Sequence, residues 1–410
     1  MTSSLSKWIT RLFKKKKLEF KNEKCSTFPL GKLPFLAVQE VIRNMDIQEG
    51  IRLALTSRKM RSNVKYSRIP VEYLAVVMND DFSYIAARES GVIFFCGPKL
   101  DKKYKKIKKD KYIKRSELEP WLNPTLSTLQ NTQNILVQIQ NTIKCDRWGL
   151  VIELKCVQTT IRDVLNISDF ETLYLFEGKL EEEDMNYLME NVKEDRGLHI
   201  MEAEIPENYY HENMLKFSDI NYEDARFIKI EHLLAIEYNY IIRIGKNNLT
   251  LSDINTFLNY WVISKYDLFK IMTINIARET ELNLDILFDG LVVLKGFRFG
   301  WASWFAVKSI KWRETPILCI ELKSDQIFLN AYSKSERPVT EDRKVDDEPY
   351  ESEFQILKVL EKKKDLEETM RIEENNERKL EIEKEIEELD LQLLEKGVRM
   401  EQGRHVFGSV

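Results

Sequence analysis

The sequence predicts a mixed α and β fold with three successive parts: a three-helix unit, a region of β-strands and strand-helix units, and a long C-terminal helix. Between residues 27 and 70, apolar residues recur at the spacing of one helical face. From 71 to 335, runs rich in β-branched and aromatic residues alternate with helical patterns. From 351 to 396, the chain contains neither Gly nor Pro and consists mostly of strong helix formers. These patterns indicate the α+β or α/β class.

The composition indicates a globular protein. Of the 410 residues, 43% are hydrophobic and 10% are aromatic, which is enough for a sizeable core. The formal net charge of −4 gives the whole molecule no attraction for nucleic acid or for an anionic membrane. No apolar run approaches the roughly 20 residues of a membrane-spanning helix, and the cysteines show no C-x-x-C spacing. We therefore expect a soluble cytoplasmic or nuclear protein with reduced thiols and no membrane span.

Residues 1–26 are expected to form a disordered basic leader. In the stretch from Trp8 to Lys17, the basic block follows the apolar residues, which is the reverse of a secretory signal. Contact with a membrane surface and nuclear import are the alternative roles of such a segment.

Three short helices are expected between residues 27 and 70. Pro34 favours a helix start, and the apolar series follows it. Asp46 and Glu49 form the pattern of a capping box for a second helix, and Ser57 can cap a third. By spacing alone, an ordinary amphipathic hairpin fits equally well. A unit of roughly 40 residues buries little surface by itself, so we expect a partner to cover part of its apolar face.

The Leu33-Pro34 start, the apolar series and the Ser57-Arg58-Lys59-Met60 end resemble the F-box family, and the Phe28-Pro29-Leu30 opening is similar to the large nematode group of that family. The resemblance implies docking onto the adaptor subunit of an SCF-type cullin ubiquitin ligase, and through it onto cullin. It assigns the following residues to the docking face: Leu33, Pro34, Phe35, Val38, Val41, Ile42, Met45, Ile47, Ile51, Leu55 and Met60. The chain departs from the family in two ways: a Trp near the end of the F-box is absent, and Gly50 weakens the second helix by about 1 kcal/mol relative to Ala.

The next segment predicts antiparallel strands and a basic loop. Tyr73–Met78 and Val92–Cys96 are rich in strand formers. Between Lys102 and Arg115, lysines interleave with Tyr and Ile, a pattern that also suits contact with nucleic acid. Because the rest of the chain is acidic, we favour a solvated loop and do not expect a nucleic-acid partner.

An internal repeat predicts strand-turn-helix units. Thr172–Leu180 followed by Asp184–Met189 parallels Tyr240–Ile244 followed by Leu249 and Asp253–Leu258. Such units favour a stacked arrangement like that of leucine-rich repeats, in which each unit buries its apolar face against its neighbour.

The segment Phe217–Ile276 resembles the second type of F-box-associated domain of the same nematode family. In that family the associated domain is thought to hold the protein substrate. The resemblance assigns residues 71–335 to this domain but defines no substrate-binding residue, so the substrate and its site are unknown.

The C-terminal part is expected to be separate from the main domain. Residues 336–350 are charged, carry Pro near each edge, and predict a linker. The helix expected over 351–396 carries Ile382, Ile386, Leu389 and Leu393 at the spacing of a heptad seam. A short coiled coil over 380–396 is therefore a candidate for self-association, and residues 397–410 are expected to form a tail.

The sequence offers little for catalysis. Only four histidines are present, namely His199, His211, His232 and His405. The motifs of serine hydrolases, zinc proteases, P-loop enzymes and dinucleotide-binding proteins do not occur. We expect no enzyme activity, no metal and no cofactor. The resemblance implies a substrate-recruiting subunit of an SCF-type ligase, and the alternative is a non-ligase interaction scaffold that works through its C-terminal helix.

Overall fold

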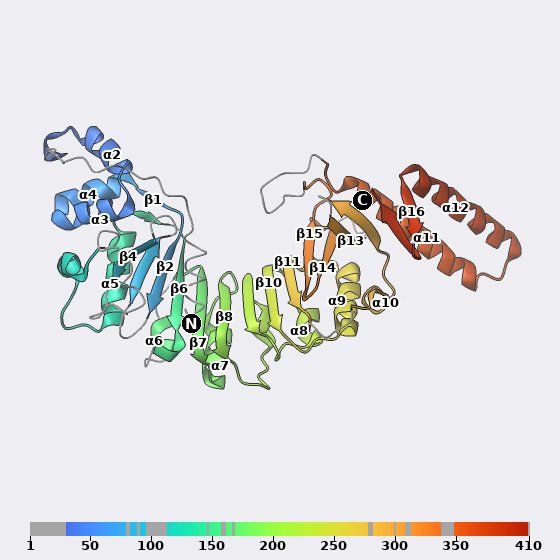
Figure 1. The fold of residues 1–410 in the computed structure, drawn as a ribbon, viewed down its shortest axis with the longest axis horizontal. Coiled ribbons are helices and arrows are strands. Elements are labelled where there is room, and N and C mark those ends of the chain that lie inside the picture. The colour runs from blue at the N-terminus through green and yellow to red at the C-terminus, as the bar shows by residue number, and fades with distance from the viewer. Residues whose placement is uncertain are drawn as a thin grey trace. The chain divides into compact units, whose positions relative to one another are not determined.

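The structure is a computed structural model (Figure 1). The residues it describes are 30–78, 83–87, 91–95, 113–145, 147–156, 161–165, 169–277, 282–298, 301–307, 313–337 and 348–408. The predicted leader at 1–26 and most of the basic run from Lys102 to Arg115 lie outside these residues. The chain divides into two compact units, Met1–Pro206 and Glu207–Val410, so the boundary between the units falls inside the predicted domain 71–335. In the described part of the chain, no helix is both long and apolar enough to cross a membrane.

The first unit begins with a short 3₁₀ helix, η1 (Leu30–Lys32). The three predicted helices follow it and are confirmed: α2 (Phe35–Arg43), α3 (Ile47–Thr56) and α4 (Arg58–Ser67). Their starts follow from local chemistry. Asp46 and Glu49 form the expected capping box, and the Ser57 side chain accepts a hydrogen bond from the Met60 backbone N–H.

The first unit also contains a mixed sheet with the strand order β4-β3-β2-β6-β7-β8. Strands β2, β3 and β4 pair antiparallel, whereas β2, β6, β7 and β8 pair in parallel. The two strand runs predicted from the sequence, β2 and β4, are separated by β3. The elements are β1 (Pro70–Val71), β2 (Leu74–Met78), β3 (Tyr84–Ala87), β4 (Gly91–Phe95), η3 (Arg115–Trp121), α5 (Thr128–Gln140), β5 (Lys144–Cys145), β6 (Trp148–Glu153), η4 (Leu154–Cys156), α6 (Ile161–Leu165), β7 (Thr172–Lys179), α7 (Glu182–Asn191) and β8 (Gly197–Glu204).

The second unit contains a mixed sheet with the strand order β16-β17-β12-β13-β14-β15-β11-β10-β9. Strands β9, β10 and β11 are parallel, and β11 to β12 continue as antiparallel pairs. The elements are η5 (Glu212–Leu215), β9 (Asp219–Asp224), α8 (Ile230–Leu234), β10 (Asn239–Lys246), α9 (Leu251–Ile263), β11 (Phe269–Asn275), α10 (Leu284–Leu287), β12 (Leu294–Arg298), β13 (Trp301–Val307), β14 (Ile317–Lys323) and β15 (Gln326–Tyr332).

The two copies of the predicted repeat are confirmed as strand-turn-helix units. The first copy is β7 followed by α7, and the second is β10 followed by α9. In each copy the next strand along the chain pairs in parallel with the first one. Of the five apolar positions expected in the core of these units, Leu180, Leu188, Phe257 and Trp261 are fully buried, whereas Leu249 is only half-buried.

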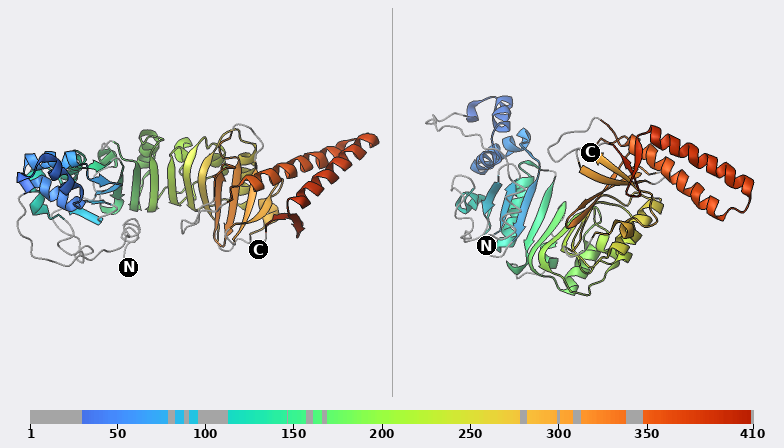
Figure 2. Two further views of the ribbon diagram at one scale, coloured as in Figure 1. Left: turned by 90° about the horizontal axis from the view of Figure 1, so that it is seen from above. Right: turned by 45° about the vertical axis from the view of Figure 1, so that its right-hand side comes forward.

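The prediction of one long C-terminal helix is wrong. The segment forms two helices, α11 (Glu351–Ile372) and α12 (Asn376–Glu395), which pack against each other as a hairpin (Figure 2). The helix ends because Glu373 adopts an extended conformation, and the Asn375 side chain caps α12 by accepting hydrogen bonds from two backbone N–H groups. An ion pair of 2.6 Å between Lys362 Nζ and Glu385 Oε1 joins the helices. Helix propensity alone contained no signal strong enough for this break.

The prediction that the C-terminal part is separate from the main domain is also wrong. Ile356, Leu357 and Leu360 of α11 are buried in one hydrophobic cluster with Leu294 and Phe305 of the sheet. At the end of the predicted linker, the Tyr350 and Tyr332 rings stack with their centroids 4.6 Å apart. Residues 338–347 of that linker lie outside the described residues.

The predicted tail is structured. It forms a hairpin of β16 (Val398–Glu401) and β17 (Arg404–Phe407), and β17 pairs in parallel with β12. The apolar surfaces of α11 and of this hairpin complete the second unit, because an uncovered sheet edge and face would otherwise remain in water.

Candidate docking surfaces

Four residues that the sequence assigned to a docking face lie in the core of the three-helix unit. Val38, Ile42, Ile47 and Ile51 are between 0% and 5% exposed. Side chains buried to this degree hold the three helices together and have no surface to offer to a partner. These four residues are therefore removed from the predicted docking set.

Gly50 also belongs to this core. A Cβ atom at this position would lie 2.3 Å from Ile69 Cδ1, so the missing side chain lets α3 approach the start of the β-region closely. Close packing thus explains a residue that helix propensity alone disfavours.

The remaining predicted docking residues are accessible. Pro34 and Phe35 are exposed, and the partly exposed members of the set are Leu33, Val41, Met45, Leu55 and Met60. Sequence reasoning missed Leu36 and Tyr66, whose exposed fractions of 72% and 61% are among the largest for apolar side chains of the described chain. The available signal was the position of Leu36, which does not follow the three- and four-residue spacing of Phe35, Val38 and Ile42.

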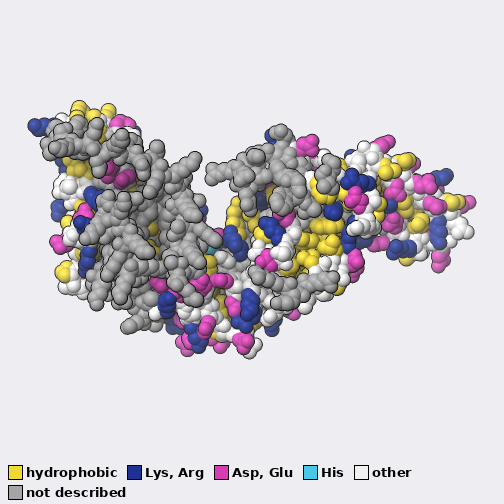
Figure 3. Space-filling model, in the orientation of Figure 1, with side chains coloured by type: hydrophobic (Ala, Val, Ile, Leu, Met, Phe, Trp, Pro, Cys, Tyr) yellow, Lys and Arg dark blue, Asp and Glu magenta, His cyan; other side chains and the backbone are white. Residues whose placement is uncertain are grey.

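Phe35, Leu36 and Tyr66 form an apolar surface on α2 and α4. The Phe35 and Tyr66 rings meet edge to face with their centroids 6.1 Å apart, so the two helices contribute to one continuous patch. Figure 3 shows hydrophobic side chains at the surface around α2. We call these three residues, together with Leu33 and Pro34, the α2–α4 patch.

Polar contacts anchor this helical unit to the rest of the first unit. The Arg52 Nε atom lies 3.0 Å from Glu117 Oε2 of η3, and the Arg61 guanidinium lies 5.2 Å from the centroid of the Trp121 ring. Arg61 Nη1 also donates a hydrogen bond to Gln138 Oε1 of α5. These contacts lie on α3 and α4 and leave the α2–α4 patch uncovered.

A second accessible surface is one face of the sheet in the second unit. Along β9, β10, β11 and β15, fully buried side chains alternate with half-buried ones, as in a sheet with one covered and one open face. Figure 1 places α8 and α9 against one face of these strands. The half-buried side chains of these strands include Asn221, Ile241, Arg243, Ile271, Thr273, Phe328 and Asn330. We call these seven residues the open sheet face.

The open sheet face combines apolar and polar groups. Ile241 and Ile271 lie directly opposite each other on adjacent strands, and Thr273 pairs with Phe328 across the next pair. Arg243 Nη1 lies 3.0 Å from Asp219 Oδ1 of β9. An apolar centre with polar groups at its margin is the composition of a protein-binding surface.

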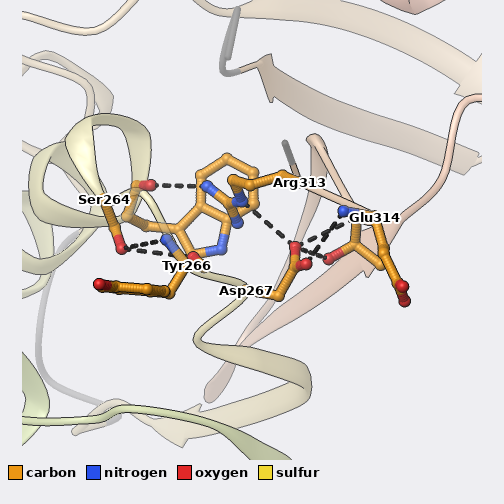
Figure 4. A network of polar contacts seen from close by, with 7 residues as sticks. Ser264, Tyr266, Asp267, Arg313 and Glu314 are labelled. Carbon is orange, nitrogen blue, oxygen red and sulfur yellow. Dashed lines mark hydrogen bonds and ion pairs between the residues drawn. The ribbon is translucent and has the colours of Figure 1, made fainter. Parts of the chain in front are cut away.

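A buried polar network lies elsewhere in the second unit (Figure 4). Arg313 Nη1 donates a hydrogen bond of 2.9 Å to the Trp261 backbone carbonyl in the last turn of α9, and the guanidinium lies 3.9 Å from the centroid of the Trp261 ring. Arg313 Nε lies 3.2 Å from Asp267 Oδ1. The side chain of Arg313 is 0% exposed and that of Asp267 is 20% exposed.

Further hydrogen bonds keep Asp267 ionised. Its carboxylate accepts from the backbone N–H groups of Glu314 and Thr315 and from Thr315 Oγ1. Burial acts to raise the pKa of Asp267, but these hydrogen bonds and Arg313 outweigh it, so the pKa lies below the usual aspartate value. Burial lowers the pKa of Arg313 despite its carboxylate partner. The network fixes the chain after α9 to the segment before β14, and we assign it a structural role.

The described residues form no metal site. In the described ranges, no group of three or more His, Cys, Asp or Glu side chains is arranged to hold a metal ion. Comparison with models of protein families, with curated proteins and with solved structures finds no match to this chain. The function is therefore inferred from the α2–α4 patch and the open sheet face.

Proposed function

We propose that this protein is a substrate-recruiting adaptor subunit of an SCF-type cullin ubiquitin ligase, with an F-box-like helical unit at residues 27–70. The observation that carries the proposal is the α2–α4 patch, in which Leu36 is 72% exposed on a helix that buries Val38 and Ile42 in the core of the unit. An amphipathic unit that has its own core and still presents large apolar side chains to water is typical of a docking module. This function places the protein in the cytoplasm or the nucleus.

The second unit supplies the other half of the proposed function. Its parallel strand-helix units are leucine-rich-repeat-like in this proposal, and the open sheet face holds the target protein. The mixture of Ile241, Ile271 and Phe328 with Arg243 and asparagine side chains suits a protein surface better than a small apolar ligand. The chain positions the target, and the other ligase subunits supply the chemistry.

The test is recovery of the ligase adaptor with tagged protein from a cell extract and from purified components. We expect Phe35→Asp with Leu36→Asp to abolish adaptor binding, because a charge in a desolvated docking face has a large unfavourable desolvation energy. Val137→Asp is the matched control, since Val137 is an exposed apolar residue of α5 in the same unit. Adaptor recovery by the double variant at the wild-type level would refute the F-box assignment.

The alternative function is a non-ligase interaction scaffold that works through the C-terminal helices. The observation in its favour is the exposure of Ile372, Leu380 and Leu394 on the helical hairpin, at 82%, 58% and 64%. Mass spectrometry of proteins recovered with wild-type and with Phe35→Asp/Leu36→Asp protein distinguishes the two functions. The scaffold function requires that the recovered partners be the same for both proteins and contain no cullin.

A further inference from the structure

We propose that the protein forms a symmetric dimer in which β16 pairs antiparallel with β16 of a second copy, centred on Met400. Strand β16 is the terminal strand in the order of the second unit's sheet, among the residues that the structure describes. A terminal strand presents backbone N–H and C=O groups to which another strand can bond.

The hairpin geometry shows which backbone groups face the open edge. Gln402 and Gly403 form the two-residue loop, and both have positive φ angles, of 51° and 77°, as in a type I′ turn. The turn bond joins the two flanking residues, Glu401 and Arg404, so their backbone groups point toward each other. Because hydrogen-bonded and non-bonded pairs alternate in an antiparallel ladder, the next pair, Met400 and His405, is a non-bonded one. Met400 therefore directs its N–H and C=O away from β17, toward the open edge.

This edge carries a self-complementary charge pattern. Met400, with 59% of its surface exposed, stands between Arg399 and Glu401, whose side chains are 47% and 43% exposed and pair with each other. In an antiparallel pair centred on Met400, the two Met400 residues exchange both backbone hydrogen bonds. Arg399 then lies opposite Glu401 of the second copy, and Glu401 lies opposite Arg399 of the second copy. Charged side chains, a bulge or a proline commonly protect an edge strand from pairing. Strand β16 has neither a proline nor a register shift, and its two charges are of opposite sign in the order that fits a second copy.

A strand of this length alone buries too little surface for a stable dimer, which needs roughly 800 Å² per partner. Helix α12 offers further apolar surface. Met400 and Leu394 both line one cavity of about 630 Å³ between the β16–β17 hairpin and the helices α11 and α12, so Leu394 lies close to Met400. Leu391, three residues earlier on the same helical face, is 60% exposed, and Leu394 is 64% exposed. In the proposed dimer, these leucines add apolar area to the contact made by the strand.

The dimer is tested by sedimentation of the full chain across a concentration series. We expect wild-type protein to sediment as a dimer. Met400→Pro should sediment as a monomer and keep the wild-type circular dichroism spectrum, since the N–H group that proline lacks bonds only across the edge. A wild-type chain that stays monomeric over the whole series would overturn the proposal, whether the edge is free or binds a different protein.

Charge exchange tests the register. Arg399→Glu alone makes the edge acidic and Glu401→Arg alone makes it basic, so each places two like-charge pairs across the interface and should weaken self-association by about tenfold or more. A mixture of the two variants should form a heterodimer in native mass spectrometry, although neither chain regains its internal Arg–Glu pair. Arg378→Glu is the matched control, because Arg378 forms a similar exposed pair with Glu381 at the far end of α12. Undiminished dimerisation of the single variants, or no heterodimer in the mixture, would refute this interface.

Discussion

The network of Arg313 and Asp267 predicts that removing the carboxylate lowers the unfolding free energy more than removing the guanidinium does. Replacing Asp267 by Ala leaves a guanidinium whose side chain is 0% exposed without its counter-charge. It also leaves two backbone N–H groups and one hydroxyl, all of which now bond to the carboxylate, without an acceptor. Breaking a buried pair by removing one partner costs about 3–5 kcal/mol of unfolding free energy.

The reverse change is expected to cost less. In Arg313→Met, Asp267 keeps its bonds to Glu314 and Thr315, and its partly exposed carboxylate keeps access to water. The losses are the ion pair with Asp267, one hydrogen bond to the Trp261 carbonyl and the stacking on the Trp261 ring, and we expect them to cost about 1–3 kcal/mol together. The double variant Asp267→Ala/Arg313→Met should be more stable than Asp267→Ala alone, because it contains no uncompensated cation.

The assay is urea unfolding of the full-length chain, monitored by circular dichroism and by fluorescence. An unfolding free energy is taken from the data only where the two transitions coincide, as two-state unfolding requires. The control pair is Glu171→Ala and Arg147→Met, since this ion pair is bidentate but exposed and should contribute only about 0–1 kcal/mol. Equal effects of Asp267→Ala and Arg313→Met, or a double variant less stable than Asp267→Ala, would refute the reasoning.

Three further predictions follow from the second unit. Leu357→Ala should lower the unfolding free energy by about 2–5 kcal/mol, and deletion of residues 351–410 should lower the melting temperature, because α11 completes the core; an unchanged melting temperature would contradict this. Ile382→Asp with Leu389→Asp should open the helical hairpin, so that limited proteolysis cuts within α12; protection equal to wild type would argue against the packing. Because the pKa of Asp267 is depressed in the folded state, its contribution to stability is complete above the usual aspartate pKa and is lost as pH falls through the folded value; the unfolding free energy of Asp267→Asn should therefore fall less on acidification than that of wild type, and parallel pH profiles would disprove the link.

Local patterns predicted local structure well. The capping residues Asp46 and Ser57 placed the helices of the N-terminal unit, and the repeat predicted both β7–α7 and β10–α9. These signals depend on neighbours within a few residues, so the sequence contains them directly.

Exposure within the candidate site was predicted less well. The apolar series from Phe35 to Met45 marked one helical face, yet Val38 and Ile42 are buried while Phe35 is exposed. A helical period identifies apolar residues that need cover but does not say whether the cover is the same chain or a partner. Only the positions of α3 and α4 in the folded unit show which apolar residues of α2 the same chain covers and which remain exposed.

The sequence by itself determined the class of the fold, the three N-terminal helices, the strand-helix units and the shortage of catalytic motifs. The tertiary structure decided what long-range contacts control: the turn at Glu373–Asn375 that folds α12 back onto α11, the burial of Leu357 against the sheet, and the pairing of β17 with β12. It also brought Arg313 to Asp267, although 46 residues separate them in the chain. Such contacts depend on apolar surface and charge that distant segments remove from water together, and no window of neighbouring residues contains both partners.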